Sequence, residues 1–471
     1  MTELWQRSAV ELAAGIRNGE YAAVEVLDAV LARVDAHNPR LNAITYDCSE
    51  SARAEAEAAD AALAAGEPVG PLHGVPLTIK ENVDQAGTPN TNGIPAFADL
   101  MADDDAPLVT NLRAAGAVII GRTNTPEFSM RATTDNPLRG RTRNPWDEEA
   151  SPGGSSGGAG VSAAMGFGPL HHGNDIGGSL RFPSFANGTV TVKPSSFRVP
   201  VHNGTAPAER AVLSATMSVQ GVIARTAADV RLATAAMIGP DPRDPTHVPL
   251  PWDGPPVEGP ITVAVTTESG DYDIHPGIVG LVERTADLLA DAGYRVVQVD
   301  PPPIHDSAIE WFRAGVTELS AALGPAMTQL GSPTINRIFE WYYELGELLD
   351  RDGYMAALAD RARHLRAWSL FLEDHPLVVT PFLMRPLYDW NADAESFEGL
   401  RDIFESAAYS LGINYLGLPA GVIGLDLVEQ RPAAVQIVGR RWREDLICDA
   451  MEAVQERAGV LTDRLWARDG V

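Results

Sequence analysis

Residues 260–300 alternate between strand and helix patterns, as a strand–helix–strand unit does. The apolar run ITVAV is followed by a segment in which Ile278, Leu281, Val282 and Leu288 recur at helical spacing, and then by the run YRVVQVD. Two strands joined through one helix pair in parallel, since the helix carries the chain back across the sheet. The sequence therefore predicts an α/β protein that contains parallel strands.

The N-terminal segment, about residues 1–70, is expected to be helical. Within residues 9–36, which read as one helix, Leu27, Val30, Leu31 and Val34 fall on one face. This apolar stripe is expected to pack in the core or against a second copy in a homodimer.

Two later segments bear on where a site could form. The run PLHGVPLTIKENV at residues 71–83 predicts a buried strand that delivers Lys80 to its end. Residues 303–375 are expected to be mostly helical, with aromatic side chains that either fill the core or line a substrate funnel. These aromatic residues are Trp311, Phe312, Trp341, Tyr342, Tyr343, Tyr354 and Trp368.

The composition excludes several classes of protein. Its 63 acidic residues exceed its 36 basic residues to give a net charge of −27, which repels phosphate backbones and anionic membranes. Direct binding to nucleic acid or to a membrane is therefore not expected. The two cysteines, Cys48 and Cys448, suit a reducing compartment and are too few for a disulfide framework. The N-terminus lacks an apolar run of signal-peptide length, so we expect a cytoplasmic protein.

Residues 151–194 carry the chemistry, because two serines lie there among glycines: Ser155 in GGSSGG and Ser179 in DIGGSLR. A serine hydroxyl needs a proton acceptor to become a nucleophile, and a lysine such as Lys80 can serve if burial lowers its pKa. The glycines before Ser179 leave backbone N–H groups free to hold an oxyanion. The alternative interpretation is a flexible or phosphate-binding loop, but the lysine that a Walker motif places after its glycines is missing.

These motifs resemble those of the amidase signature family. The hallmark of that family is GGSSGG, then G-x-D-x-GGS-[IL]-R-x-P, then KP, and the chain has them at 153–158, 173–183 and 193–194. The run GVPLTIK, which ends at Lys80, resembles the strand that carries the family's catalytic lysine. The separations of Lys80, Ser155 and Ser179 are similar to those in the fatty-acid amide hydrolase branch, and the resemblance covers nearly the whole chain.

The resemblance implies a role for each of these residues. Ser179 would be the nucleophile, Ser155 would relay its proton, and Lys80 would be the base that accepts it. The peptide bond between Gly154 and Ser155 would be cis. The resemblance also assigns the oxyanion hole to the N–H groups of Ile176, Gly177, Gly178 and Ser179, the bracing of this loop to Asp175 and Arg181, and a supporting hydrogen bond to Ser156.

The resemblance places Phe128, Ser129 and Met130 in the acyl pocket. Two departures bear on substrate choice, since Arg131 and Asn174 stand where the family commonly has glycine and threonine. No cofactor is implied. His171 and His172 are neighbours along a predicted strand, where adjacent side chains face opposite ways, so no metal site is expected from them.

The implied fold is a single α/β/α domain over residues 1–471 around a large, mixed, twisted sheet. Its catalytic core would span about 71–200, and the helical segment at about 303–375 would lie over the site entrance. The implied activity is hydrolysis of a linear carboxylic amide, or a similar carbamate or ester, of a small aryl or alkyl substrate. Two alternatives remain: the glutaminase subunit of an aminoacyl-tRNA amidotransferase, which needs a partner chain, and a catalytically silent binding protein on this fold.

Overall fold

The computed structural model describes residues 3–468, which fold around one sheet of 11 strands in the order β1-β3-β2-β4-β6-β5-β10-β11-β9-β7-β8. β2 is parallel to β3 and β4, and β7 is parallel to β8 and β9, whereas the other neighbours are antiparallel. The strands are β1 (Ile44–Asp47), β2 (Pro76–Lys80), β3 (Val118–Thr123), β4 (Leu170–Asp175), β5 (Val190–Lys193), β6 (Val219–Ala224), β7 (Thr262–Val265), β8 (Arg295–Gln298), β9 (Leu377–Pro381), β10 (Ala420–Val428) and β11 (Arg431–Gly439).

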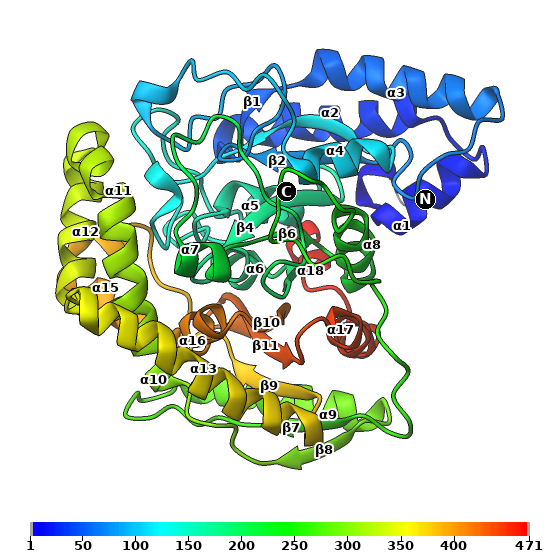
Figure 1. The fold of residues 1–471 in the computed structure, drawn as a ribbon. Coiled ribbons are helices and arrows are strands. Elements are labelled where there is room, and N and C mark those ends of the chain that lie inside the picture. Colours follow the sequence, from blue (N-terminus) through cyan, green and yellow to red (C-terminus); the bar gives the residue numbers. More distant parts are fainter. Residues whose placement is uncertain (1–2, 469–471) are drawn as a thin grey trace.

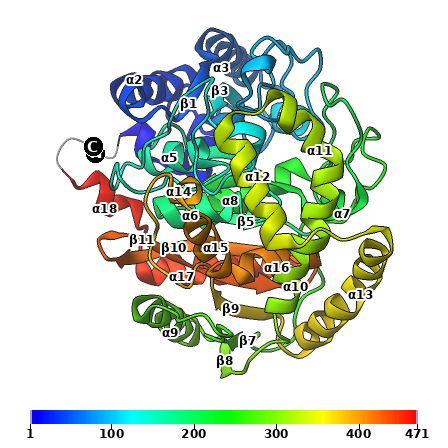
Figure 2. The same ribbon diagram turned by 90° about the vertical axis from the view of Figure 1, so that its left-hand side faces the viewer.

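Helices cover both faces of this sheet, so the predicted α/β/α fold is confirmed. Figures 1 and 2 show α8 (Ala227–Met237) and α17 (Glu444–Ala458) on one side, and α11 (Thr317–Leu330), α12 (Pro333–Gly346) and α16 (Ala408–Leu416) on the other. The predicted strand, helix and strand unit is also present, because α9 (Pro276–Asp291) joins the parallel strands β7 and β8.

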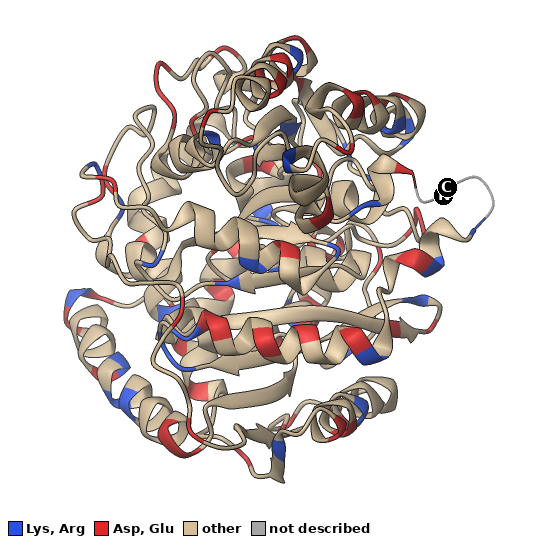
Figure 3. Cartoon of the chain, turned by 90° about the vertical axis from the view of Figure 1, so that its right-hand side faces the viewer, with Lys and Arg blue, Asp and Glu red and all other residues tan. Residues whose placement is uncertain are grey.

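The remaining helices are mostly short and connect the strands. They are η1 (Leu4–Gln6), α3 (Ser49–Ala64), η2 (Pro95–Phe97), α4 (Pro107–Ala114), η3 (Glu127–Ser129), α5 (Gly157–Met165), α6 (Arg181–Asn187), α7 (Val212–Met217), α14 (Ala392–Glu395), α15 (Phe397–Glu405) and α18 (Thr462–Trp466). No helix within residues 3–468 is both long and apolar enough to cross a membrane. Acidic residues are spread over several helices and loops of the face in Figure 3 rather than gathered in one place.

The N-terminal stripe packs inside the chain. The helix expected over residues 9–36 is in fact two helices, α1 (Ala9–Arg17) and α2 (Ala23–Leu41). The break follows from Gly19, whose φ of 71° lies in the left-handed region that ends helices. Leu27 and Val30 on α2 are completely buried in the main core.

The segment 303–375 is helical as predicted. It comprises α10 (His305–Glu310), the π-helix η4 (Trp311–Val316), α11, α12 and α13 (Arg351–Asp374). Trp311 and Trp368 are both buried. A π-helical turn inside a longer helix is rare and often occurs near a functional site.

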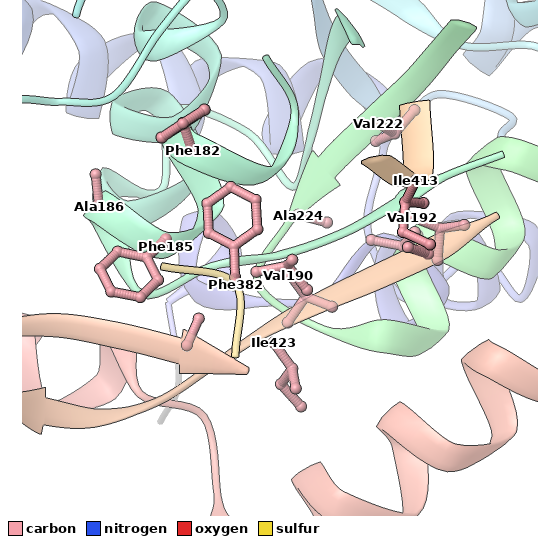
Figure 4. Close-up of a cluster of buried hydrophobic side chains, with 14 of the residues drawn as sticks. Phe182, Phe185, Ala186, Val190, Val192, Val222, Ala224, Phe382, Ile413 and Ile423 are labelled. Atoms are coloured by element: carbon pink, nitrogen blue, oxygen red, sulfur yellow. The ribbon is translucent and has the colours of Figure 1, made fainter. Parts of the chain in front are cut away.

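The core closest to the glycine-rich stretch lies under α6. Figure 4 shows Phe182 and Phe185 of α6 packed near Phe382, with Val190 and Val192 of β5 alongside. The rings of Phe182 and Phe382 meet edge to face with their centroids 5.1 Å apart. Each such side chain contributes roughly 1.5–3 kcal/mol when fully buried. Because α6 begins two residues after Ser179, this packing fixes the backbone that carries that serine.

Candidate active site

Lys80 is the last residue of β2, a strand whose five residues are all buried. Its Nζ lies 2.8 Å from Ser155 Oγ, 3.0 Å from Ser156 Oγ and 2.8 Å from Asn174 Oδ1. The first two partners precede α5 and the third belongs to β4. Three separate segments thus converge on one buried amine.

Burial lowers the pKa of Lys80 well below its ordinary value, and the negative charge of Asp175 only partly opposes this effect. Desolvation disfavours the charged form of a group, so a buried lysine loses its proton more readily. A neutral amine has a lone pair, and Lys80 can therefore accept a proton from the hydroxyl beside it.

The two serines lie on adjacent backbone segments. The peptide bond between Gly154 and Ser155 is cis, and the N–H of Ser156 donates to the carbonyl oxygen of Ser179 at 3.2 Å. Ser155 is buried, whereas Ser179 is partly exposed. No hydrogen bond joins the two hydroxyls within residues 3–468, and Ser179 Oγ has no partner there, which leaves it free to face a substrate.

The loop between β4 and α6 is held through its carbonyl oxygens. The indole Nε1 of Trp311 donates to Ile176 O at 2.7 Å, and Ser410 Oγ donates to Gly177 O at 2.9 Å. The N–H of Gly178, expected among the oxyanion donors, instead donates to Asp175 Oδ1 at 2.8 Å and is occupied in this structure. The N–H groups of Ile176, Gly177 and Ser179 make no hydrogen bond within residues 3–468.

Asp175 and Arg181 form a buried ion pair beneath this loop. Arg181 Nε donates to Asp175 Oδ2 at 3.0 Å, and Asn414 Nδ2 donates to Asp175 Oδ1 at 2.9 Å. Burial alone would raise the pKa of Asp175, but the pairing with Arg181 and these hydrogen bonds outweigh it and lower the pKa to about 2. The carboxylate therefore stays charged and can accept the N–H of Gly178 and, at 3.1 Å, that of Leu180.

Ser179 opens into a pocket with largely apolar walls. Tyr342 closes one side, where its hydroxyl donates to Met130 O at 3.1 Å, and the Phe404 ring lies 5.5 Å from the Tyr342 ring. The lining residues are Ser129, Met130, Arg131, Ala132, Gly154, Ile176, Gly177, Ser179, Phe182, Trp311, Tyr342 and Phe404. The helical segment at 303–375 thus contributes two aromatic walls.

The residues expected in the acyl pocket divide into two groups. Ser129, Met130 and Arg131 line this pocket, whereas Phe128 and Asn174 are not among its lining residues. The positive charge of Arg131 is paired with Asp393, because its guanidinium donates to Asp393 Oδ1 at 2.8 Å and to Oδ2 at 3.1 Å. Asn174 instead contacts Lys80.

His171 and His172 bond to different partners. His171 shares hydrogen bonds with Thr78 Oγ1 at 2.9 Å and Gly168 O at 3.0 Å, whereas His172 Nε2 lies 3.0 Å from Gln220 Oε1. Burial lowers the pKa of each imidazole to about 3, so both are neutral at physiological pH. Among the described residues, no group of three or more histidine, cysteine or acidic side chains could hold a metal ion.

Several contacts of the site could not be found from the sequence. Trp311, Ser410 and Asn414 reach the glycine-rich loop from positions more than 130 residues away. The sequence does mark Trp311 as one of a set of aromatic residues, but that pattern does not distinguish a core residue from one that holds the loop between β4 and α6.

Comparisons with known proteins show which proteins the chain is similar to. The family model described as Amidase matches residues 25–448. An indoleacetamide hydrolase of Bradyrhizobium diazoefficiens is 47% identical over 98% of this chain and 88% of its own length. A glutamyl-tRNA(Gln) amidotransferase subunit from Salinispora arenicola is 30% identical over 98% of this chain and 99% of its own. The solved structure of a 6-aminohexanoate cyclic dimer hydrolase in complex with substrate superposes with a TM-score of 0.82 at 26% identity, and covers 97% of this chain and 98% of that one.

Proposed function

The chain belongs to the amidase family and hydrolyses amide bonds, and from this premise we propose that it does so through an acyl-enzyme on Ser179. The observation that supports this mechanism best is the position of Lys80. Its buried amine lies 2.8 Å from Ser155 Oγ. The next residue, Ser156, donates its backbone N–H to the carbonyl oxygen of Ser179, so the two serine segments lie side by side.

In the proposed acylation step, Ser179 Oγ attacks the carbonyl carbon of the amide. The Ser179 proton passes to Ser155 while the Ser155 proton passes to the neutral Lys80. The resulting ammonium returns a proton through Ser155 to the leaving nitrogen, and the C–N bond breaks. A water molecule then attacks the ester carbonyl, gives its proton to the same relay, and releases the acid with Ser179 restored.

The tetrahedral intermediate carries a negative oxygen that needs donors. We assign this role to the N–H groups of Ile176, Gly177 and Ser179, which have no partner within residues 3–468. Removing one such donor typically slows acyl transfer about 10² to 10³-fold. The ion pair of Asp175 with Arg181 holds the loop from below and keeps these groups in place.

The proposed substrate is a small linear amide with an aromatic acyl group. The pocket at Ser179 is walled by Phe182, Trp311, Tyr342 and Phe404, whose rings can stack on or meet the edge of an aryl group. The Bradyrhizobium relative is named for hydrolysis of indoleacetamide, an aryl-substituted acetamide. Arylacetamides are therefore the first compounds to try.

A glutaminase subunit is the second candidate, because the Salinispora relative matches over nearly the full length of both chains. The two candidates differ in their need for a partner. The isolated chain should turn over arylacetamides if the first proposal is correct. Release of ammonia from glutamine only after addition of an amidotransferase partner would support the second.

The direct test is covalent labelling. The wild type is treated with a fluorophosphonate, its intact mass is measured and the adduct is mapped, and ammonia release from phenylacetamide and indoleacetamide is followed in parallel. We expect one adduct on Ser179, and loss of both labelling and turnover in Ser179→Ala. Ser162→Ala is a matched control, since Ser162 is a buried serine of α5 whose hydroxyl has no hydrogen-bond partner among residues 3–468. An adduct at another residue, or normal turnover in Ser179→Ala, would contradict the mechanism.

A further inference from the structure

We propose that Asn174 is a positioning residue that aims the lone pair of Lys80 at Ser155. This inference rests on the proposed function, in which Lys80 acts as the base. It concerns a residue that does not line the substrate pocket and contacts the base instead.

The geometry at Nζ fixes which way the lone pair points. A neutral amine has two N–H donors and one lone pair, and Nζ has three partners: Ser155 Oγ, Ser156 Oγ and Asn174 Oδ1. A side-chain amide oxygen can only accept, so one N–H goes to Asn174. The Ser156 hydroxyl donates to the backbone carbonyl of Asn174 at 3.3 Å, so it accepts the second N–H. The remaining position faces Ser155, whose proton the lone pair can take.

The orientation of the Asn174 amide is itself determined by its neighbours. Its Nδ2 donates to Asn82 Oδ1 at 2.9 Å, and Asn82 Nδ2 donates to Ser129 Oγ at 2.9 Å. Ser129 in turn donates to Asn92 Oδ1 at 2.6 Å. Rotating the Asn174 amide would set its nitrogen against the amine and its oxygen against Asn82 Oδ1. The chain of hydrogen bonds therefore keeps Oδ1 toward Lys80.

The other charged and titratable groups near Lys80 do not accept a hydrogen bond from its amine. The backbone N–H of Lys80 donates to Nδ1 of His172 of β4 at 3.4 Å, and Arg122 of β3 donates to the Lys80 carbonyl oxygen at 3.1 Å. Asp175 acts on the amine through its charge, and its oxygens are engaged by Arg181, Asn414 and the loop N–H groups. Asn174 is therefore, with Ser156, one of the two side-chain acceptors that hold the N–H groups of the amine.

Two substitutions separate positioning from a purely structural role. Asn174→Leu has a similar size but no acceptor, so the lone pair is no longer aimed. We expect the maximal rate at high pH to fall about 10²-fold, as for other small misplacements of a catalytic group.

Asn174→Asp keeps an acceptor in the same place and adds a negative charge. That charge favours the ammonium form, so the acid limb of the pH profile should shift upward by about one pH unit or more, while the rate at high pH stays near that of the wild type.

The measurement is the rate of Ser179 labelling by a fluorophosphonate between about pH 5 and 10, with thermal melts to show that each variant is folded. This readout does not depend on knowing the natural amide. Asn203→Asp is the matched control, because Asn203 is also half-buried and contacts Asn82 but not Lys80, and it should leave the acid limb in place.

Each outcome decides between the two levels of inference. An Asn174→Leu variant that is labelled as fast as the wild type at high pH would overturn the role of Asn174. An acid limb of Asn174→Asp that coincides with that of the wild type would also overturn the role of Asn174. If Asn174→Leu does not fold, the pH profile of Asn174→Asp alone tests that role. Failure to label Ser179 in the wild type would instead contradict the proposed function on which the inference rests.

Discussion

Lys80 occupies a position where a positive charge is costly. Its side chain is completely buried, and burial lowers the pKa of its amine well below the ordinary value. In the unfolded chain the same amine has a pKa of about 10.4. Between the folded and unfolded pKa values, the unfolded chain therefore binds one more proton than the folded protein. This proton difference links the proposed base to the stability of the fold.

The first prediction uses Lys80→Met, which removes the titrating group and keeps the length of the side chain. Because the unfolded wild type binds the extra proton, the free energy of unfolding of the wild type rises with pH by about 1.4 kcal/mol per pH unit from this residue. The stability of Lys80→Met relative to the wild type should therefore decrease as the pH rises from about 7 toward 10. Urea unfolding of both proteins at several pH values measures this difference.

A constant difference across that pH range would contradict the depressed pKa. Lys193→Met is not a suitable control, since burial lowers the pKa of Lys193 to about 7 as well. Ser155→Ala is better, because it removes one hydrogen-bond partner of Lys80 but leaves the amine in place. The stability of Ser155→Ala should keep the pH dependence of the wild type.

At the scale of elements, two helices hold the loop between β4 and α6 by its carbonyl oxygens. A peptide carbonyl and the following N–H share one plane and point in opposite directions. The bond from Trp311 of η4 to Ile176 O therefore sets the direction of the Gly177 N–H. The bond from Ser410 of α16 to Gly177 O orients the next peptide, whose Gly178 N–H donates to Asp175, and so anchors the backbone just before Ser179. The loop is thus oriented by helices that are distant in the sequence.

The second prediction concerns Trp311→Phe, which keeps an aromatic wall but removes the indole donor. We expect kcat to fall by about 10 to 10²-fold with a smaller change in KM, because the loop N–H groups are less well oriented in the transition state. Ser410→Ala removes the other anchor and does not line the pocket, so its kcat should fall while KM stays the same. Steady-state kinetics on one arylacetamide measure both. A rise in KM alone for both variants would contradict an orienting role.

The sequence predicted the elements that carry the site better than the contacts between them. The strand that ends at Lys80 and the unit β7, α9 and β8 are local patterns, and both are confirmed. The bond between Trp311 and Ile176 spans 135 residues, and helical periodicity does not reveal which partner an aromatic side chain meets. Nothing in the local sequence indicates that the N–H of Gly178 bonds to Asp175.

For the molecule as a whole, the buried histidines of β4 make the fold sensitive to acid. Each imidazole has one donor and one acceptor satisfied: His171 between Thr78 and Gly168, and His172 between the Lys80 N–H and Gln220. Burial lowers the pKa of both to about 3. In the unfolded chain their pKa is about 6.5, so between that pH and about 3 the unfolded state binds protons that the folded state does not bind.

The last prediction is therefore a loss of stability as the pH falls from about 6.5 toward 3, to which each histidine contributes up to about 1.4 kcal/mol per pH unit. Asp229 acts in the opposite sense, because burial raises its pKa to about 6 and protonation then favours the folded state. The contribution of Asp229 cancels when the stability of His171→Gln is compared with that of the wild type, since Asp229 is present in both proteins. Glutamine offers a donor and an acceptor without titrating, so the urea midpoint of His171→Gln should decline less between about pH 7 and 5. His202→Gln, in a half-buried loop, controls for the loss of a histidine, and an equal decline in all three proteins would show that His171 is not the acid-sensitive group.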